Sequence, residues 1–143
     1  MEEIHQFYAV TKSGSLYLVS DEIDPKSHCP IVEKIDQTHV GHFGVGGRLR
    51  NGNLVGITHA GIVLFITDKH NHTAEYVNTA YWGGTTSPII GLFMSEVKAR
   101  ECFNSNDLQV FDNRWINETN EVLGAIGSDH DIFRPELEFL AGL

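Results

Sequence analysis

The amino-acid sequence predicts an α+β fold: an antiparallel β-sheet in the first two thirds of the chain, then two C-terminal helices, with a third left open. Segments rich in β-branched and aromatic residues, separated by short turns, occupy residues 1–94. Residues 95–143 instead carry helix-capping residues and an apolar stripe at helical spacing. Strands followed by helices are typical of α+β proteins. A length of 143 residues suits one domain, so residues 1–143 are expected to fold as a single unit.

The strands are predicted from β-rich segments that end at Gly- or Pro-containing turns. Two hairpins are expected: 7–11 with 15–19 around Lys12-Ser13-Gly14, and 54–58 with 62–67 around His59-Ala60-Gly61. Further short strands are expected at 30–35, 73–79 and 87–93. Pro88 has no N–H to donate, so it belongs at a strand start or a sheet edge.

The first helix is predicted to begin after Ser95, a residue type that caps helix N-termini. Glu96 then lies in the first turn, where the helix dipole favours an acid. Val97, Cys102 and Phe103 are expected to form its apolar face.

The second helix is predicted after Asp112, another capping residue type. Its apolar stripe is expected to consist of Trp115, Thr119, Val122, Leu123 and Ile126. Gly127 is expected to end it. Residues 135–141 are the candidate third helix.

Charge is distributed unevenly along the chain, whose net charge is -9. Residues 1–36 and 96–143 are acidic, whereas residues 37–95 carry more Lys and Arg than acids, and no acid lies between Asp36 and Asp68. The acidic balance argues against binding long nucleic acids. A small anion responds to the local field, so a basic site in the middle stretch is compatible with the charge. A buried sheet core would exclude acids equally well.

Sequence composition and motifs also indicate the cellular compartment and which kinds of catalysis to exclude. No apolar run approaches the roughly 20 residues that cross a bilayer, so no membrane partner is expected. The acidic start Met1-Glu2-Glu3 lacks a signal-peptide pattern, and two cysteines do not make a disulfide framework, so a cytoplasmic protein is expected. Phosphate-binding loop, dinucleotide-binding and hydrolase-elbow motifs are absent, and neither cysteine has a nucleophile signature. No catalytic residue and no cofactor are therefore predicted.

The histidines leave one enzymatic alternative open. His39 with His42 and His70 with His72 could be ligand pairs, because neutral imidazole suits zinc. Residues 39 and 42 would point to opposite faces of an extended strand, and no flanking acid cluster supports them. No metal site is therefore predicted, and a His-based metal-dependent hydrolase remains the alternative function.

Two segments are candidate binding elements. In the first, Gly46 lets the backbone approach a ligand, and Arg48 and Arg50 would share one strand face able to hold a phosphate. In the second, Tyr81 and Trp82 could stack on a base.

Thr86 follows this aromatic pair and could reach a ribose or phosphate oxygen. A solvated hairpin and a packed aromatic corner are the structural alternatives for the two segments. Taken together, an Arg-bearing segment and a stacking pair without a catalytic group favour a binder of a small nucleotide.

In organisation the chain resembles the phage anti-Thoeris sponges, which sequester cyclic ADP-ribose-type immune signals. The resemblance lies in the β-rich front, the Gly46-Gly47-Arg48 segment, the Tyr81-Trp82 pair and two C-terminal helices joined around Asp112-Asn113-Arg114-Trp115. It implies a symmetric homo-oligomer, such as a hexamer, that holds the nucleotide without cleaving it. It also implies stacking by Trp82 or Tyr81 and a phosphate contact from Arg114. A second site for cyclic oligonucleotides would fall on Gly46 and Arg48.

A further alternative is an acidic protein-protein inhibitor module that uses the charges of 1–36 and 96–143. Binding by such a module would weaken steeply with salt.

Overall fold

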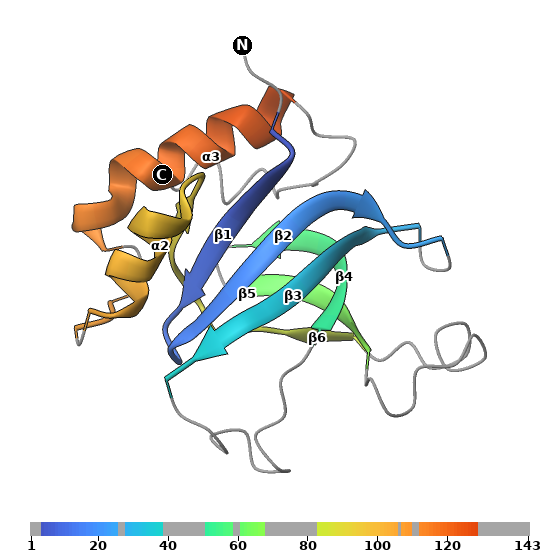
Figure 1. Ribbon diagram of the computed structural model, residues 1–143, viewed down its shortest axis with the longest axis horizontal. Helices are drawn as coiled ribbons and strands as arrows, with labels where there is room; N and C mark the ends of the chain where they lie inside the picture. The colour runs from blue at the N-terminus through green and yellow to red at the C-terminus, as the bar shows by residue number, and fades with distance from the viewer. Residues whose placement is uncertain are drawn as a thin grey trace.

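Among the residues that the structure describes, seven strands form one antiparallel sheet in the order β6-β5-β4-β3-β2-β1-β7, and helices follow the last strand. The computed structural model describes residues 4–25, 28–38, 51–58, 61–67, 83–105, 107–109 and 112–128. The strands are β1 (Gln6–Thr11), β2 (Ser15–Ile23), β3 (Pro30–Gln37), β4 (Asn51–Thr58), β5 (Gly61–Thr67), β6 (Gly83–Thr85) and β7 (Ile89–Phe93). The helices are α2 (Glu96–Phe103), the short 3-10 helix η1 (Asn113–Trp115) and α3 (Ile116–Ser128). The predicted α+β fold is confirmed (Figure 1).

Both predicted hairpins are present. In the first, the Gly14 N–H donates to the Thr11 carbonyl at 2.9 Å and Gly14 has a φ of 81°, a conformation that glycine adopts without strain. In the second, Thr58 pairs with Gly61 across the turn. Period-2 patterning and turn chemistry were sufficient to locate these four strands because each pair is local in sequence.

The remaining strands differ in part from expectation. The strand expected at 30–35 extends to Gln37, and Pro88 directly precedes β7. β6 was not predicted as a strand, because Gly83 and Gly84 have low strand propensity. The strand expected at 73–79 and the helix expected at 135–141 lie outside the described residues.

The sheet is strongly curled, and a short stretch of chain connects its two edge strands. β6 and β7 are at opposite edges, yet only residues 86–88 separate them. The Thr86 N–H donates to the Ile62 carbonyl at 3.0 Å, and the Lys12 N–H donates to the Pro88 carbonyl at 2.9 Å. Thr86 thus bonds to β5, and Pro88, two residues later, bonds to the turn between β1 and β2. In Figure 1, β1 to β3 accordingly pass in front of β4 to β6.

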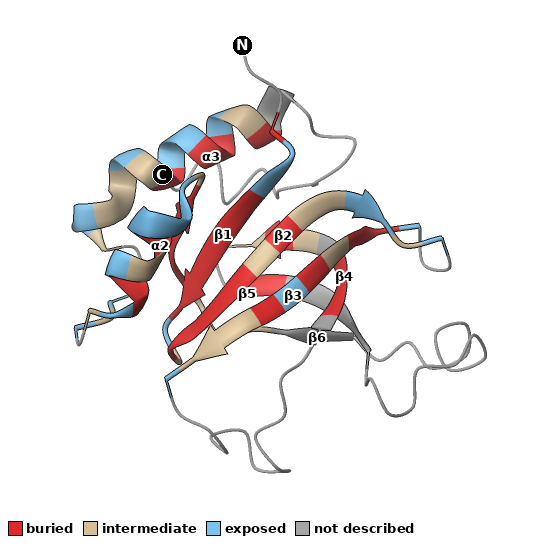
Figure 2. Cartoon of the chain, viewed as in Figure 1, coloured by how far each residue is buried: buried red, intermediate tan, exposed pale blue. Residues whose placement is uncertain are grey.

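Curling gives the sheet a concave face and a convex face, each with its own apolar core. The concave core joins side chains of β1 to β5 and β7 to those of α3, and its strand members include Phe7, Val19, Val32, Leu54, Ile57 and Ile62. α3 contributes Val122, Leu123 and Ile126, and it lies beside the start of β1 (Figure 1). The convex core packs Tyr8, Val10, Leu16, Ile90 and Phe93 against α2. Figure 2 shows buried residues along β1 and β2 and on the sides of α2 and α3 that face the sheet, and all five residues of β7 are buried.

The helices begin where they were predicted to begin. The Ser95 hydroxyl accepts a hydrogen bond from the Lys98 N–H at 3.5 Å, and the Asp112 carboxylate caps η1, which leads directly into α3. α3 ends at Ser128, one residue beyond the glycine expected to stop it.

The predicted apolar face of α2 is wrong at Val97, which is 70% exposed. The buried residues of the helix are Ala99, Cys102 and Phe103. Spacings of three and four residues place these on one face, whereas Val97 precedes Ala99 by two residues and so lies on the far side.

In the part of the chain that the structure describes, no helix is long and apolar enough to cross a membrane.

Candidate functional site

Four strands begin or end at the same end of the sheet, which we call the loop end. It is formed by Gln37 at the end of β3, Asn51 at the start of β4, Thr67 at the end of β5 and Gly83 at the start of β6. The antiparallel register fixes this, because Asn51 pairs with Thr67, and Gly83 pairs with Phe65 two residues before it. β3 extends beyond the start of β4 at this end, because Val32 pairs with Gly52 and β3 continues to Gln37.

A buried lysine lies on the concave face near the loop end. Alternate residues of β3 are buried, namely Pro30, Val32 and Lys34, and Lys34 is only 4% exposed. Period-2 alternation therefore places an ammonium where the sheet otherwise presents apolar side chains to its core. Lys34 pairs with Tyr17 across the strand, and Tyr17 belongs to the concave core.

The Lys34 ammonium is held by polar and aromatic neighbours. Its Nζ donates to the Gln37 Oε1 at 3.3 Å and lies 5.6 Å from the centroid of the Tyr17 ring, within the range of a cation–π contact. Taking an ammonium out of water is costly, so contacts of this kind are needed to keep it charged in the core.

Tyr17 and Ser15 complete the polar part of the concave face. Burial raises the pKa of the Tyr17 phenol to about 12, with the nearby Ser15 hydroxyl opposing part of the rise. Tyr17 is therefore neutral at physiological pH. Ser15 is 1% exposed, and its Oγ, although near Tyr17, has no partner in hydrogen-bond geometry among the described residues. Ser15 pairs with Gln37, so it lies beside the residue that holds Lys34.

Five of the seven predicted binding residues fall, in sequence, within the two connections whose described ends lie at the loop end. Gly46, Arg48 and Arg50 belong to the connection from β3 to β4, and Tyr81 and Trp82 belong to the connection from β5 to β6. These five residues lie outside the described part of the chain. Arg50 immediately precedes Asn51 in sequence, and Trp82 immediately precedes Gly83, so each is bonded to a residue at the loop end.

The structure places Thr86 at the closure of the sheet. Its Oγ1 accepts from the Ile62 N–H at 2.8 Å and donates to the Ser87 carbonyl at 2.9 Å. The Thr86 hydroxyl therefore stabilises the crossing from β6 to β7.

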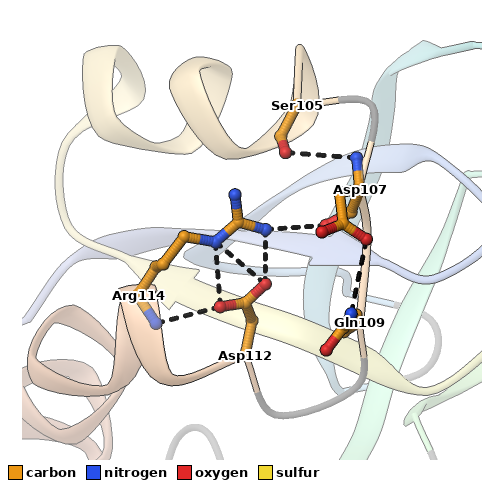
Figure 3. A network of polar contacts seen from close by, with 5 residues as sticks. All are labelled: Ser105, Asp107, Gln109, Asp112 and Arg114. Atoms are coloured by element: carbon orange, nitrogen blue, oxygen red, sulfur yellow. Dashed lines mark hydrogen bonds and ion pairs between the residues drawn. The ribbon is translucent and has the colours of Figure 1, made fainter.

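Arg114 lies in η1, and its guanidinium is engaged within the chain (Figure 3). Its Nε donates to both carboxylate oxygens of Asp112 at 3.0 and 3.1 Å, and its Nη2 donates to the Asp107 carbonyl at 2.7 Å. The ion pair lowers the pKa of Asp112 and raises that of Arg114. An incoming phosphate would have to compete with Asp112, so the arrangement favours a structural role for Arg114 in the connection between α2 and α3.

The cysteine side chains do not offer an activated nucleophile in this fold. Cys102 is fully buried on the face of α2 that packs against the sheet, and burial raises the pKa of its thiol to about 12. Cys29 is also buried. Among the described residues, no group of three or more His, Cys, Asp or Glu side chains could hold a metal ion, and the pairs His39/His42 and His70/His72 lie outside that part of the chain.

Sequence reasoning did not identify Lys34 and Ser15 as buried polar residues. The signal for Lys34 was present, because a lysine in phase with Pro30 and Val32 breaks the apolar half of the alternation. The burial of Ser15 depends on how the sheet curls, so no local sequence pattern predicts it.

We compared the chain with protein families, curated proteins and solved structures, and none of them matches it.

Proposed function

We propose that the protein binds a small nucleotide of the cyclic ADP-ribose type at the loop end of the sheet and sequesters it without cleavage. The observation that carries the proposal is topological. The connection with Arg48 and Arg50 and the connection with Tyr81 and Trp82 both join the sheet at the loop end, near the buried Lys34. Phosphate-binding and base-stacking residue types, separated by some 30 positions in sequence, thus directly precede β4 and β6, the two strands on either side of β5.

The dimensions suit a mononucleotide-sized ligand. Adjacent strands are about 4.8 Å apart, so β4 and β6, the two strands on either side of β5, are about 10 Å apart. A base stacked on Trp82 would contribute about 1–3 kcal/mol, and charge-assisted hydrogen bonds from Arg48 would add to it. Each 1.4 kcal/mol corresponds to a tenfold change in affinity, so these two contacts together would raise the affinity by several orders of magnitude.

Sequestration asks less of the site than catalysis does. A sponge needs affinity and burial of the ligand, whereas an enzyme also needs a group whose pKa suits nucleophilic attack or proton transfer. The raised pKa of Cys102 keeps that thiol protonated and out of such chemistry. The proposal includes a cytoplasmic, symmetric homo-oligomer, as the resemblance to the anti-Thoeris sponges implies.

The decisive experiment is to incubate the purified protein with a panel of cyclic nucleotides, remove unbound ligand, denature by heat and identify what is released. Recovery of an intact cyclic ADP-ribose-type molecule is the expected result. A cleaved product would show an enzyme, such as the His-based hydrolase. Failure to retain any member of the panel would overturn the proposal.

Variants locate the binding site. Trp82→Ala and Arg48→Ala should each weaken binding of the retained nucleotide at least tenfold by calorimetry, with an unchanged circular dichroism spectrum. Arg114→Ala should have a smaller effect, because Asp112 already holds that guanidinium. Lys98→Ala, which removes a half-exposed charge on α2, is the matched control and should bind normally. Unchanged affinity in Trp82→Ala, Arg48→Ala and Arg114→Ala would exclude this site.

A further inference from the structure

We infer that Lys12, in the turn between β1 and β2, contacts a phosphate group of the bound nucleotide at the loop end. The inference rests on the proposed function and deepens it, because it adds a described residue of the first hairpin to the site. The turn lies at this end of the sheet, since the N–H of Thr38, directly after β3, donates to the Gly14 carbonyl at 2.8 Å.

The turn is bonded to chain segments that adjoin both binding connections. Thr38 is the first residue of the connection from β3 to β4, and its hydroxyl also donates to the Gly14 carbonyl, at 3.2 Å. Ser87 follows β6, the strand that the aromatic-bearing connection enters, and its Oγ accepts from the Ser13 N–H at 3.0 Å. The turn that carries Lys12 therefore contacts the start of the first connection and the segment that follows the second.

Hydrogen bonds hold the backbone of this turn in place. The Lys12 N–H donates to the Pro88 carbonyl at 2.9 Å, and the Gly14 N–H donates to the Thr11 carbonyl at 2.9 Å. A Cβ added to Gly14 would clash with the Thr38 hydroxyl, so the turn and the start of the connection are closely packed. A charge on a fixed backbone loses less conformational freedom on binding than one on a mobile loop.

The Lys12 ammonium is available to a ligand. The residue is exposed, and within the described part of the chain no ion pair or side-chain hydrogen bond engages it. By contrast, Lys98, Arg100 and Arg114 are each paired with a carboxylate. A phosphate would have to displace an acid from any of these three, whereas it would displace none from Lys12.

The charges around the turn favour an anion. Asp36, which precedes the connection from β3 to β4, is engaged elsewhere, because its carboxylate accepts from the Arg100 Nη1 at 3.2 Å. No acid follows it in sequence before Asp68, so the connection that starts at Thr38 brings only basic and neutral residues up to β4. A small anion responds to this local charge rather than to the net charge of the protein.

The test is a calorimetric titration of the full chain with cyclic ADP-ribose, inorganic pyrophosphate and the uncharged nucleoside adenosine, each at low and at high salt. Lys12→Gln removes the charge, and Lys12→Arg keeps it. Both variants should fold as the wild type does, because no described contact uses the Lys12 ammonium, and urea denaturation checks this. Lys98→Gln, which removes a half-exposed charge on α2, is the matched control.

We expect Lys12→Gln to weaken cyclic ADP-ribose and pyrophosphate about threefold to tenfold at low salt, as for a charge-assisted contact that solvent partly screens. High salt should narrow this difference, because it screens the charge. Lys12→Arg and Lys98→Gln should bind as the wild type does, and adenosine binding should be the same in every variant.

If the wild-type protein holds cyclic ADP-ribose and Lys12→Gln holds it equally well, the Lys12 contact is wrong while the proposed function stands. If pyrophosphate binds through Lys12 but no nucleotide binds, the contact stands and the proposed function fails. A loss in Lys12→Gln that Lys12→Arg does not restore would overturn a contact made through charge. Binding of none of the probes would overturn both.

Discussion

Lys34 and Ser15 illustrate how single side chains on the concave face depart from the pattern of their strands. Both are almost fully buried, and both are polar where the neighbouring inward positions are apolar. Lys34 is held by Gln37 and the Tyr17 ring, whereas the Ser15 hydroxyl is left without a partner among the described residues. Polar groups kept in a core at a cost to stability are typical of positions under functional constraint.

The unpartnered Ser15 hydroxyl leads to a stability prediction. Ser15→Ala should leave the free energy of unfolding unchanged or raise it by about 1 kcal/mol, because a buried hydroxyl without a partner destabilises the folded state. Urea denaturation of the ligand-free protein measures this. The matched control is Ser13→Ala, which removes the hydrogen bond between the Ser13 and Ser87 hydroxyls at 2.9 Å and should lower stability. A loss of more than about 1 kcal/mol in Ser15→Ala would show that its hydroxyl is satisfied in solution.

At the scale of elements, α3 covers the edge of β7 that is not paired with another described strand. The Leu92 N–H of this edge strand donates to the Thr119 Oγ1 at 3.1 Å, and Thr119 donates in turn to the Trp115 carbonyl at 2.8 Å. Thr119 is 4% exposed, and Leu92 belongs to the concave core. One hydroxyl thus links helix to sheet and satisfies an edge group that would otherwise be open to pairing with another chain.

Thr119→Val should therefore destabilise the protein by about 1–3 kcal/mol, although valine has the same shape, because it leaves the buried Leu92 N–H without an acceptor. Thr119→Ser keeps the hydroxyl and should lose less. Urea denaturation of both variants against wild type gives the comparison. Equal stability of Thr119→Val and wild type would mean that water replaces the hydroxyl at this edge.

At the scale of the whole molecule, closure of the sheet and the cover of two helices desolvate groups that then titrate differently in the folded and unfolded states. Burial raises the pKa of Cys102 from 9.0 to about 12 and that of Tyr17 from 10.0 to about 12. Both groups therefore stay protonated to a higher pH in the folded protein than in the unfolded one. The stability that this contributes is fully present below the unfolded pKa values and is lost as the pH rises through the folded ones.

The protein should thus lose stability between pH 9 and 12. Urea denaturation at a series of pH values, under reducing conditions, measures the loss. Cys102→Ala and Tyr17→Phe should each flatten the alkaline decline, because each removes one of the two titrating groups. A wild-type profile that stays level up to pH 12 would contradict the burial of these groups in solution.

The sequence by itself determined most of the local structure. The hairpin around Gly14, the cap at Ser95 and the helix start at Asp112 depend on neighbouring residues, so pattern and turn chemistry were enough to find them. The error at Val97 was also local, because an apolar residue was assigned to a face that its helical phase does not reach.

Tertiary structure alone decided which distant parts of the chain meet. Pairing of Asn51 with Thr67 and of Gly83 with Phe65 brings the Arg-bearing and aromatic-bearing connections to one end of the sheet. The sheet also curls so that β6 is followed directly by β7 at the opposite edge, and Lys34 and Ser15 are buried on its concave face. Strand register and burial depend on contacts between residues far apart in sequence, and no short pattern encodes them.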